Sequence, residues 1–264
     1  MSDAAATLRI AAVGDLHCSR SSQGKLQPLF AEAARRADVL LLCGDLTDYG
    51  LPEEAHVLTR ELEAAGKLPV LAVLGNHDFE SGHATELIDV LRAAGVQMIE
   101  GEGVEVGGIG FAGAKGYGGG FGQRAIEPWG EEATKHFVHE ALQEALKLES
   151  GLARLRTPQR VAVLHYAPIL ETVVGEPADI FPFLGTSRLE EPLNRFKVAV
   201  CFHGHAHRGQ PEGRTATGIP VFNVALPVLK AAFPDGSPLR VVELPVNPAF
   251  EEKRVGDRRM GTVG

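Results

Sequence analysis

LPVLAVLGNHD, residues 68–78, is the stretch around which this chain is organised. An apolar run over residues 68–74 leads into Gly75, and Asn76, His77 and Asp78 follow in single file. A short apolar run bounded by glycine is typical of a buried strand, so the three polar residues lie just past its end. Polar side chains crowded at the end of a buried strand lower the stability of the fold, so their presence indicates that they serve a function. We therefore expect a functional site there.

Other apolar runs of the sequence end in the same way. Runs at 8–13, 38–43, 160–164 and 198–202 are followed by further polar residues, namely Asp15 and His17, Asp45, His165, and His205 and His207. Helical spacing at 26–37, 52–66 and 85–94 separates the first strands. Alternating strands and helices with near-continuous apolar strands predict a parallel sheet covered by helices. In such a sheet, ligands bind outside the carboxyl ends of the strands.

The regular alternation of apolar strands and helices ends near residue 100. We expect short strands with glycine turns at 104–113, a helix at 131–148, an irregular segment at 171–187, a short helix at 188–196, and closing strands at 220–224 and 239–244. Residues 113–122 (GAKGYGGGFG) are too rich in glycine for a regular element. This loop is either a substrate lid, with Lys115, Tyr117 and Arg124 as contacts, or a flexible hairpin tip. Likewise Tyr166, Phe181 and Phe183 either line a substrate pocket or pack in the core.

Composition sets limits on the class of protein. The chain has 264 residues, of which 44% are apolar, and a formal net charge of -8. An acidic balance disfavours nonspecific binding to nucleic acid or an anionic membrane, although bound cations still permit a phosphate substrate. Cys18, Cys43 and Cys201 form no CxxC pair, which indicates reduced thiols and a cytoplasmic location. No apolar run approaches the roughly 20 residues that span a bilayer.

We expect a single domain over residues 1–245, because the polar strand ends extend from Asp15 to His207. Residues 246–264 are charged and lack periodicity, so we expect a C-terminal tail there. The sequence does not fix the oligomeric state, and a homodimer is one option.

The types of these polar residues indicate the chemistry of the site. Asp15 and His17 are two positions apart, as are His205 and His207, so each pair can face one way from an extended segment. Carboxylate, amide and imidazole groups without thiolate suit Mn, Fe, Co or Zn. Taken singly, Asp15 or Asp45 could simply close a turn. The recurrence at five strand ends favours a site for metal ions.

The ordered set D-x-H, G-D, G-N-H-D, H and G-H-x-H, from Asp15 to His207, resembles the calcineurin-like metallophosphoesterase superfamily. That resemblance implies an α/β fold in which two mixed sheets pack as a sandwich flanked by helices. It also implies a hydrolase that uses two metal ions to cleave phosphate esters. One ion would be held by Asp15, His17 and His207 and the other by Asn76, His165 and His205, with Asp45 bridging both.

The same resemblance implies roles for the remaining motif residues. A bridging hydroxide would attack phosphorus in line, His77 would protonate the leaving oxygen, and Asp78 would orient the His77 imidazole. Phosphoprotein phosphatases of the superfamily carry arginines that this chain lacks beside its second and third motifs. Purple acid phosphatases carry a tyrosine ligand where Asp48 stands here.

The pattern looks most like the bacterial phosphodiesterase branch, so we expect a small phosphodiester substrate. A phosphomonoesterase, a nuclease of the superfamily and a noncatalytic metal-binding scaffold are the alternatives.

Overall fold

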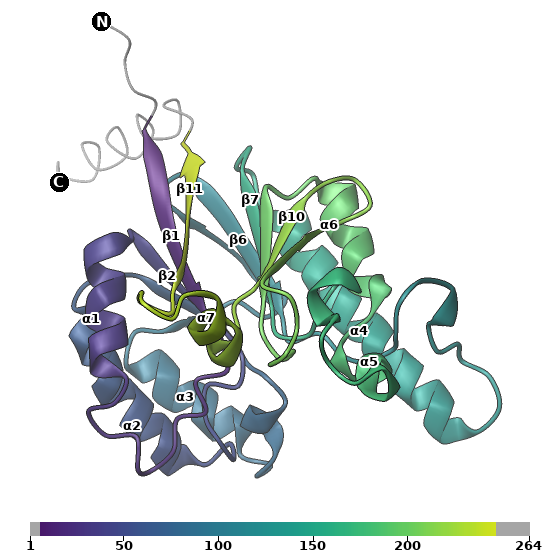
Figure 1. Ribbon diagram of the computed structural model, residues 1–264, viewed down its shortest axis with the longest axis horizontal. Coiled ribbons are helices and arrows are strands. Elements are labelled where there is room, and N and C mark those ends of the chain that lie inside the picture. The colour runs from purple at the N-terminus through teal and green to yellow at the C-terminus, as the bar shows by residue number, and fades with distance from the viewer. Residues whose placement is uncertain (1–5, 247–264) are drawn as a thin grey trace, which may run out of the picture.

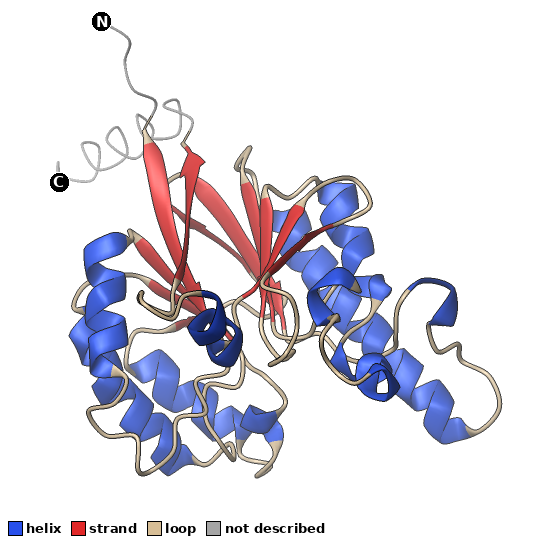
Figure 2. Ribbon diagram, viewed as in Figure 1, coloured by secondary structure: helices blue, strands red, loops and turns tan. Residues whose placement is uncertain are grey.

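The computed structural model describes residues 6–246 of the chain. Two β-sheets face each other, and helices cover the outer side of each (Figures 1 and 2). Helices α1 to α3 lie outside the first sheet, and α4 and α6 lie outside the second. The expected α/β sandwich is therefore confirmed. The expected tail at 246–264 lies outside the described residues except for Val246, which is buried.

The first sheet has the strand order β11-β1-β2-β3-β4. Its strands are β1 (Thr7–Val13), β2 (Val39–Cys43), β3 (Val70–Val73), β4 (Gln97–Met98) and β11 (Arg240–Pro245). Strands β1 to β4 are parallel, and β11 pairs antiparallel with β1. The crossovers are α1 (Gln27–Arg36), α2 (Pro52–Leu62) and α3 (Ala84–Ala93). Strands β2 and β3 are buried at every residue, which explains why they read as unbroken apolar runs.

The second sheet has the order β5-β6-β7-β8-β10-β9. Its strands are β5 (Gly103–Val106), β6 (Ile109–Ala114), β7 (Arg160–Leu164), β8 (Val200–His203), β9 (Glu212–Arg214) and β10 (Pro220–Asn223). The central strands β6, β7, β8 and β10 are parallel, and only the edge strands β5 and β9 pair antiparallel. The second half is thus less hairpin-like than its glycine turns indicate.

The remaining helices are α4 (Glu132–Arg154), α5 (Phe181–Leu184), α6 (Glu190–Phe196) and α7 (Leu226–Ala232). Helix α4 continues six residues beyond the expected end at Leu148, because Leu152 in that extension is buried against the second sheet. Strands β4 and β9 and helix α7 were not expected. No helix among residues 6–246 is long and apolar enough to cross a membrane.

The inner faces of the two sheets share one apolar core. Leu41 and Leu71 from the first sheet and Val163 and Phe202 from the second belong to the same cluster, and all four are fully buried. Burying such side chains contributes roughly 1.5–3 kcal/mol each. This shared core aligns the carboxyl ends of β1, β2, β3, β7 and β8, which meet near the lower centre of Figure 1.

Candidate metal centre

The turns that carry the candidate ligands have an unusual backbone. Asp15, His17, Asp45 and His205 take positive φ values of 55°, 43°, 46° and 69°. Within residues 6–246, Lys197 at the end of α6 is the only other non-glycine residue to do so. Left-handed backbone in non-glycine residues costs about 1–3 kcal/mol each and concentrates at functional sites. The fold therefore holds these four side chains in place at the expense of stability.

Glycines next to these ligands allow the close packing. A Cβ atom at Gly75 would lie 2.8 Å from Asp45 Cγ, and one at Gly44 would lie 2.5 Å from His165 Cγ. These separations are shorter than real Cβ contacts, so both positions require glycine. The glycines of the G-D and G-N-H-D motifs are thus explained by the approach of one motif to another.

The first group of candidate ligands contains Asp15, His17 and His207. One ligand atom of each lies within 4.8 Å of the others. His207 Nε2 lies 2.8 Å from Asp15 Oδ1. His17 Nε2 is buried and has no hydrogen-bond partner, although it faces Asp45 Oδ2 at 3.8 Å. An unpartnered buried nitrogen is costly, and a cation between these groups would satisfy it.

The second group contains Asp45, His165 and His205, whose ligand atoms also lie within 4.8 Å of one another. His165 Nδ1 lies 3.0 Å from the Cys43 carbonyl, to which it can donate, so Nε2 points into the site. That nitrogen lies 3.3 Å from Asp45 Oδ1 and 3.0 Å from Asn76 Oδ1. A carbonyl on the far nitrogen fixes the ring of a metal-binding histidine in this way.

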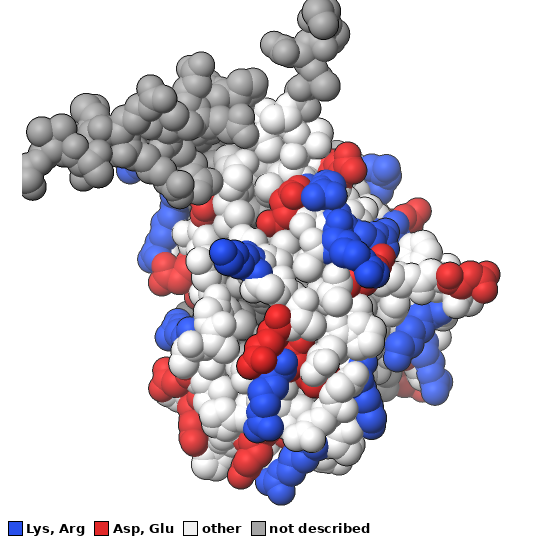
Figure 3. Space-filling view, turned by 90° about the vertical axis from the view of Figure 1, so that its left-hand side faces the viewer, with Lys and Arg blue, Asp and Glu red and all other residues white. Residues whose placement is uncertain are grey.

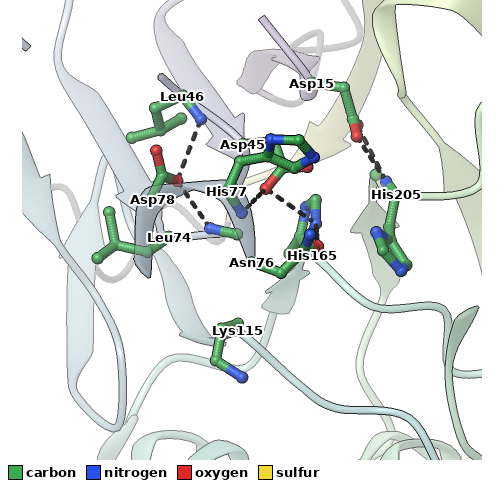
Figure 4. A network of polar contacts seen from close by, with 12 residues as sticks. Asp15, Asp45, Leu46, Leu74, Asn76, His77, Asp78, Lys115, His165 and His205 are labelled. Carbon is green, nitrogen blue, oxygen red and sulfur yellow. Dashed lines mark hydrogen bonds and ion pairs between the residues drawn. The ribbon is translucent and has the colours of Figure 1, made fainter. Parts of the chain in front are cut away.

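Asp45 belongs to the second group and also faces the first, and Figure 4 shows its carboxylate beside His165. One of its carboxylate oxygens faces His165 and the other faces His17. The structure therefore brings all seven predicted ligands to one place, with Asp45 in the position that the bridge requires. Their assignment as ligands is still a prediction.

The electrostatics of the site fit cation binding. Burial opposes charge on His165, but the Asp45 carboxylate outweighs it and raises the pKa of His165 to about 9. Burial also disfavours charge on Asp45, yet His165 holds the Asp45 pKa well below its usual range. Burial lowers the pKa of His205 to about 3, so this imidazole is neutral and its lone pair is free for a metal. A cation would replace the proton on His165 while keeping Asp45 compensated.

His77 lies beside the candidate ligands, and one of its ring nitrogens lies within 4.8 Å of ligand atoms of His17 and Asp45. Its backbone N–H donates to Asp45 Oδ1 at 2.9 Å, and its Nδ1 lies 2.7 Å from the Asp48 carbonyl oxygen. The ring is about one-third exposed and lies 4.6 Å from the His17 ring, centroid to centroid. With Nδ1 held by a carbonyl, Nε2 is free to face a substrate.

The structure gives the Asp78 carboxylate hydrogen-bond partners other than the His77 imidazole. This carboxylate is fully buried and accepts hydrogen bonds from the backbone N–H groups of Leu46, Thr47 and Gly75 and from the Thr47 hydroxyl, at 2.6–3.1 Å. It joins the two loops that carry Asp45 and Asn76 and does not touch the His77 ring, whose Nδ1 is held by the Asp48 carbonyl. The sequence places Asp78 beside His77 but gives no sign of these backbone donors.

Two further residues act behind the ligands and were not predicted. The Asp48 carboxylate lies 3.3 Å from His17 Nδ1, so Asp48 orients His17 with its side chain and His77 with its carbonyl. His203 is fully buried between the Gly204 carbonyl and the Thr172 hydroxyl, and burial lowers its pKa to about 4. Asp48 stands three residues after Asp45, and that spacing is the one sequence signal that could have drawn attention to it.

Comparison with known proteins agrees with this geometry. The model of the calcineurin-like phosphoesterase family matches residues 8–209, so the chain belongs to that family. The resemblance inferred from the motifs is thereby confirmed, and with it membership in a metallophosphoesterase family. No curated protein matches the chain.

Several solved structures share the fold. Phosphopantetheinyl hydrolase from Mycobacterium tuberculosis superposes with a TM-score of 0.65 at 15% identity, over 88% of this chain and 95% of its own. A purple acid phosphatase from yellow lupin (Lupinus luteus) seeds gives 0.53 at 12% identity, over 85% and 44%. GAP50, described as the anchor in the inner membrane complex of Plasmodium, gives 0.53 at 13% identity, over 84% and 72%. Identities this low establish a common fold only.

Proposed function

We propose that this protein is a dinuclear-metal-dependent hydrolase of phosphate esters and that phosphodiesters are its preferred substrates. The observation that carries the proposal is the convergence of two ligand groups on a shared Asp45. Two divalent cations bound there would polarise the phosphoryl oxygens and lower the pKa of a water molecule, supplying the nucleophile. Mn, Fe, Zn and Co all suit these donors.

The protein's own side chains supply the rest of the chemistry. Asp45 would place a negative charge between two bound cations, and Asn76 would offer its neutral amide oxygen, which lies next to His165. His77 faces the site with a free Nε2, from which it can stabilise charge on the phosphoryl group and donate a proton to the leaving oxygen. The Asp48 carbonyl keeps His77 in the tautomer with its proton on Nδ1 when the ring is neutral, so protonation of Nε2 yields the acid.

The charges around the site favour a diester over a monoester. No arginine within residues 6–246 is hydrogen-bonded or ion-paired through its side chain to any of the seven candidate ligands. Asp48 and Glu80 instead place partly exposed carboxylates beside His17 and His77. A diester carries one negative charge and a monoester up to two, so a site with acidic neighbours accommodates the diester at lower electrostatic cost.

Hydrolysis of bis-p-nitrophenyl phosphate with added Mn tests the proposal, with p-nitrophenyl phosphate as the monoester control. We expect turnover that is lost on chelation and restored by Mn. Asp45→Ala should abolish both metal binding and turnover. His77→Ala should lower kcat by about 10²–10⁴-fold while leaving two metals bound. Full activity in metal-stripped protein would overturn the mechanism, and loss of both metals from His77→Ala would overturn the role of His77.

The nuclease and scaffold alternatives make different predictions. A nuclease needs a basic track for the phosphate backbone, whereas basic and acidic side chains are intermixed on the face shown in Figure 3. GAP50 is described as an anchor and shares the fold, so the fold alone does not require catalysis. The complete ligand set in this chain is what favours an enzyme. Cleavage of single-stranded DNA with Mn, or metal-loaded protein inactive on every ester, would favour one of the alternatives.

A further inference from the structure

Large apolar side chains are exposed on both sides of the candidate metal centre. Tyr49 is 54% exposed, Phe79 42%, Ile180 39% and Phe183 58%. We refer to these four residues as the apolar rim. Single exposed apolar residues are common on protein surfaces, but several next to one candidate site indicate a binding function.

One side of the apolar rim is attached to His77. Phe79 lies two residues after His77 in the same one-turn 3-10 helix, His77–Phe79. Tyr49 directly follows Asp48, whose carbonyl oxygen lies 2.7 Å from His77 Nδ1. Both exposed rings therefore belong to the two loops that also place the proposed proton donor.

The other side of the apolar rim is attached to His205. The Phe183 carbonyl oxygen lies 3.1 Å from His205 Nε2. Ile180 directly precedes α5, the helix that carries Phe183. The Phe183 ring rests edge-on against Phe137 of α4, with 6.1 Å between the ring centroids, and this contact supports the ring while leaving it exposed.

Aromatic rings connect the two sides. Tyr166 stacks 4.3 Å from the His205 ring, and Tyr117 lies 5.9 Å from Tyr166. The Lys115 ammonium lies 4.8 Å from the Tyr117 ring and 5.7 Å from the Phe79 ring, measured to the centroids. A chain of contacts thus extends from the candidate ligand His205 through Tyr166, Tyr117 and the Lys115 ammonium to Phe79 in the loop of His77. The Lys115 side chain points away from the ligands in Figure 4, so its charge does not occupy the mouth of the site.

The glycine-rich loop keeps this surface in place. Gly119 donates its N–H to the Pro182 carbonyl at 2.6 Å, and Gly120 donates to the Gly185 carbonyl at 2.9 Å. The loop is therefore packed along the segment that carries Phe183. Of the two alternatives that the sequence left open, these backbone hydrogen bonds to residues 182–185 disfavour a flexible hairpin tip. The glycine-rich loop at 113–122 and the irregular segment at 171–187 therefore pack against each other beside His205.

We propose that the substrate is a phosphate ester whose organic group is apolar, an aryl or alkyl chain, and that this group binds on the apolar rim. The inference rests on the proposed hydrolase function, because it places the phosphate at the metal centre. A sugar or polyol would need hydrogen-bonding side chains for its hydroxyl groups. The rim instead offers three rings and one aliphatic side chain, and carboxylates stand next to it, Asp48 beside His17 and Glu80 beside His77.

Dissociation constants of alkylphosphonates for the zinc-loaded protein, measured by ligand-observed NMR, test this inference without turnover. The series is methyl-, butyl- and phenylphosphonate, with 4-hydroxybutylphosphonate as the polar control. Full burial of a methylene is worth about a fourfold gain in affinity, and half burial about twofold. Butylphosphonate, with three more half-buried methylenes, should therefore bind about eightfold more tightly than methylphosphonate, and the hydroxybutyl compound should lose most of that gain.

Variants of exposed residues locate the effect. Phe183→Ala removes one of the three rings of the apolar rim and should therefore lower the butyl-to-methyl affinity ratio. Leu146→Ala, at a similarly exposed position of α4 (55%), is the matched control and should keep the eightfold ratio. A gain for phenyl- but not butylphosphonate would identify an aryl group, and equal gains would identify any apolar chain.

The outcomes also separate the two proposals. If methylphosphonate binds but butyl- and phenylphosphonate bind no better, the apolar rim has no role and only this inference is overturned. If the ratio survives Phe183→Ala and is lost in Leu146→Ala, the location is wrong. If no phosphonate binds and bis-p-nitrophenyl phosphate is not hydrolysed either, the hydrolase proposal itself fails. If that diester is still hydrolysed, only this inference is overturned.

Discussion

Adding one methyl group at Gly75 should disable the site, because the loop of Asn76 approaches the loop of Asp45 too closely for any side chain. The Cβ of an alanine would lie 2.8 Å from Asp45 Cγ, with Asp45 Oδ1 and the Asp45 backbone N closer still. An ordinary van der Waals separation begins at 3.4 Å, so the carboxylate must move by at least about 0.6 Å. Displacements of about 1 Å cost on the order of 100-fold in rate. We therefore expect Gly75→Ala to lower kcat/KM by about 10- to 100-fold.

The assay is Mn-dependent hydrolysis of bis-p-nitrophenyl phosphate, combined with metal analysis and thermal unfolding. Overpacking costs about 1–3 kcal/mol, so the variant should still fold. Gly236→Ala is the control, because a Cβ there meets nothing closer than 3.7 Å and Gly236 has no positive φ. Wild-type activity and metal content in Gly75→Ala would refute the reasoning that these motif glycines exist to bring Asp45 to the metals.

Three other predictions follow from named contacts. Asp48→Ala removes the carboxylate that faces His17 Nδ1 and should weaken binding of one metal by about 10–100-fold in titrations. The control is Glu86→Ala, because the Glu86 carboxylate pairs with the exposed His83, and this variant should leave metal affinity unchanged. Asp78→Ala leaves three buried backbone N–H groups without an acceptor, at a cost of about 1–3 kcal/mol each. The free energy of unfolding of this variant in urea should therefore fall by several kcal/mol, far more than that of His77→Ala. Equal losses in the two variants would contradict the structural role of Asp78. The pKa of His165 is raised to about 9, so a bound metal must displace the proton of this imidazole. Metal affinity measured by calorimetric titration should therefore rise about tenfold per pH unit from pH 7 to about pH 9. An affinity that does not change with pH would show that His165 does not bind metal.

The sequence predicts this fold well where burial determines the residue pattern. Strands β2 and β3 are buried on both faces, so their apolar runs are unambiguous. Strands β4 and β9 are two and three residues long, too short to produce a pattern. Helix α7 begins at Leu226, separated from the end of β10 by two residues, and its second residue is a proline, so the sequence there is typical of a loop. Tertiary contacts and not local periodicity decide such elements.

Only part of the candidate site could be predicted from the sequence. Its seven candidate ligands could be predicted to lie together because each follows an apolar strand and because they occur in the order of a known family. The supporting contacts were not, since they join backbone groups distant in sequence. Asp78 reaches Leu46 and Thr47, and the carbonyl of Asp48 reaches His77, which no motif records. The packing of the glycine-rich loop on residues 182–185 could not be predicted from the sequence either, because glycine forms hydrogen bonds through its backbone alone.

An anomalous difference map from crystals grown with Mn tests the central claim most directly. We expect two peaks of comparable height on either side of the Asp45 carboxylate, one reached by Asp15, His17 and His207 and the other by Asn76, His165 and His205. A single peak, or ions that leave Asp45 uncoordinated, would contradict the two-metal site.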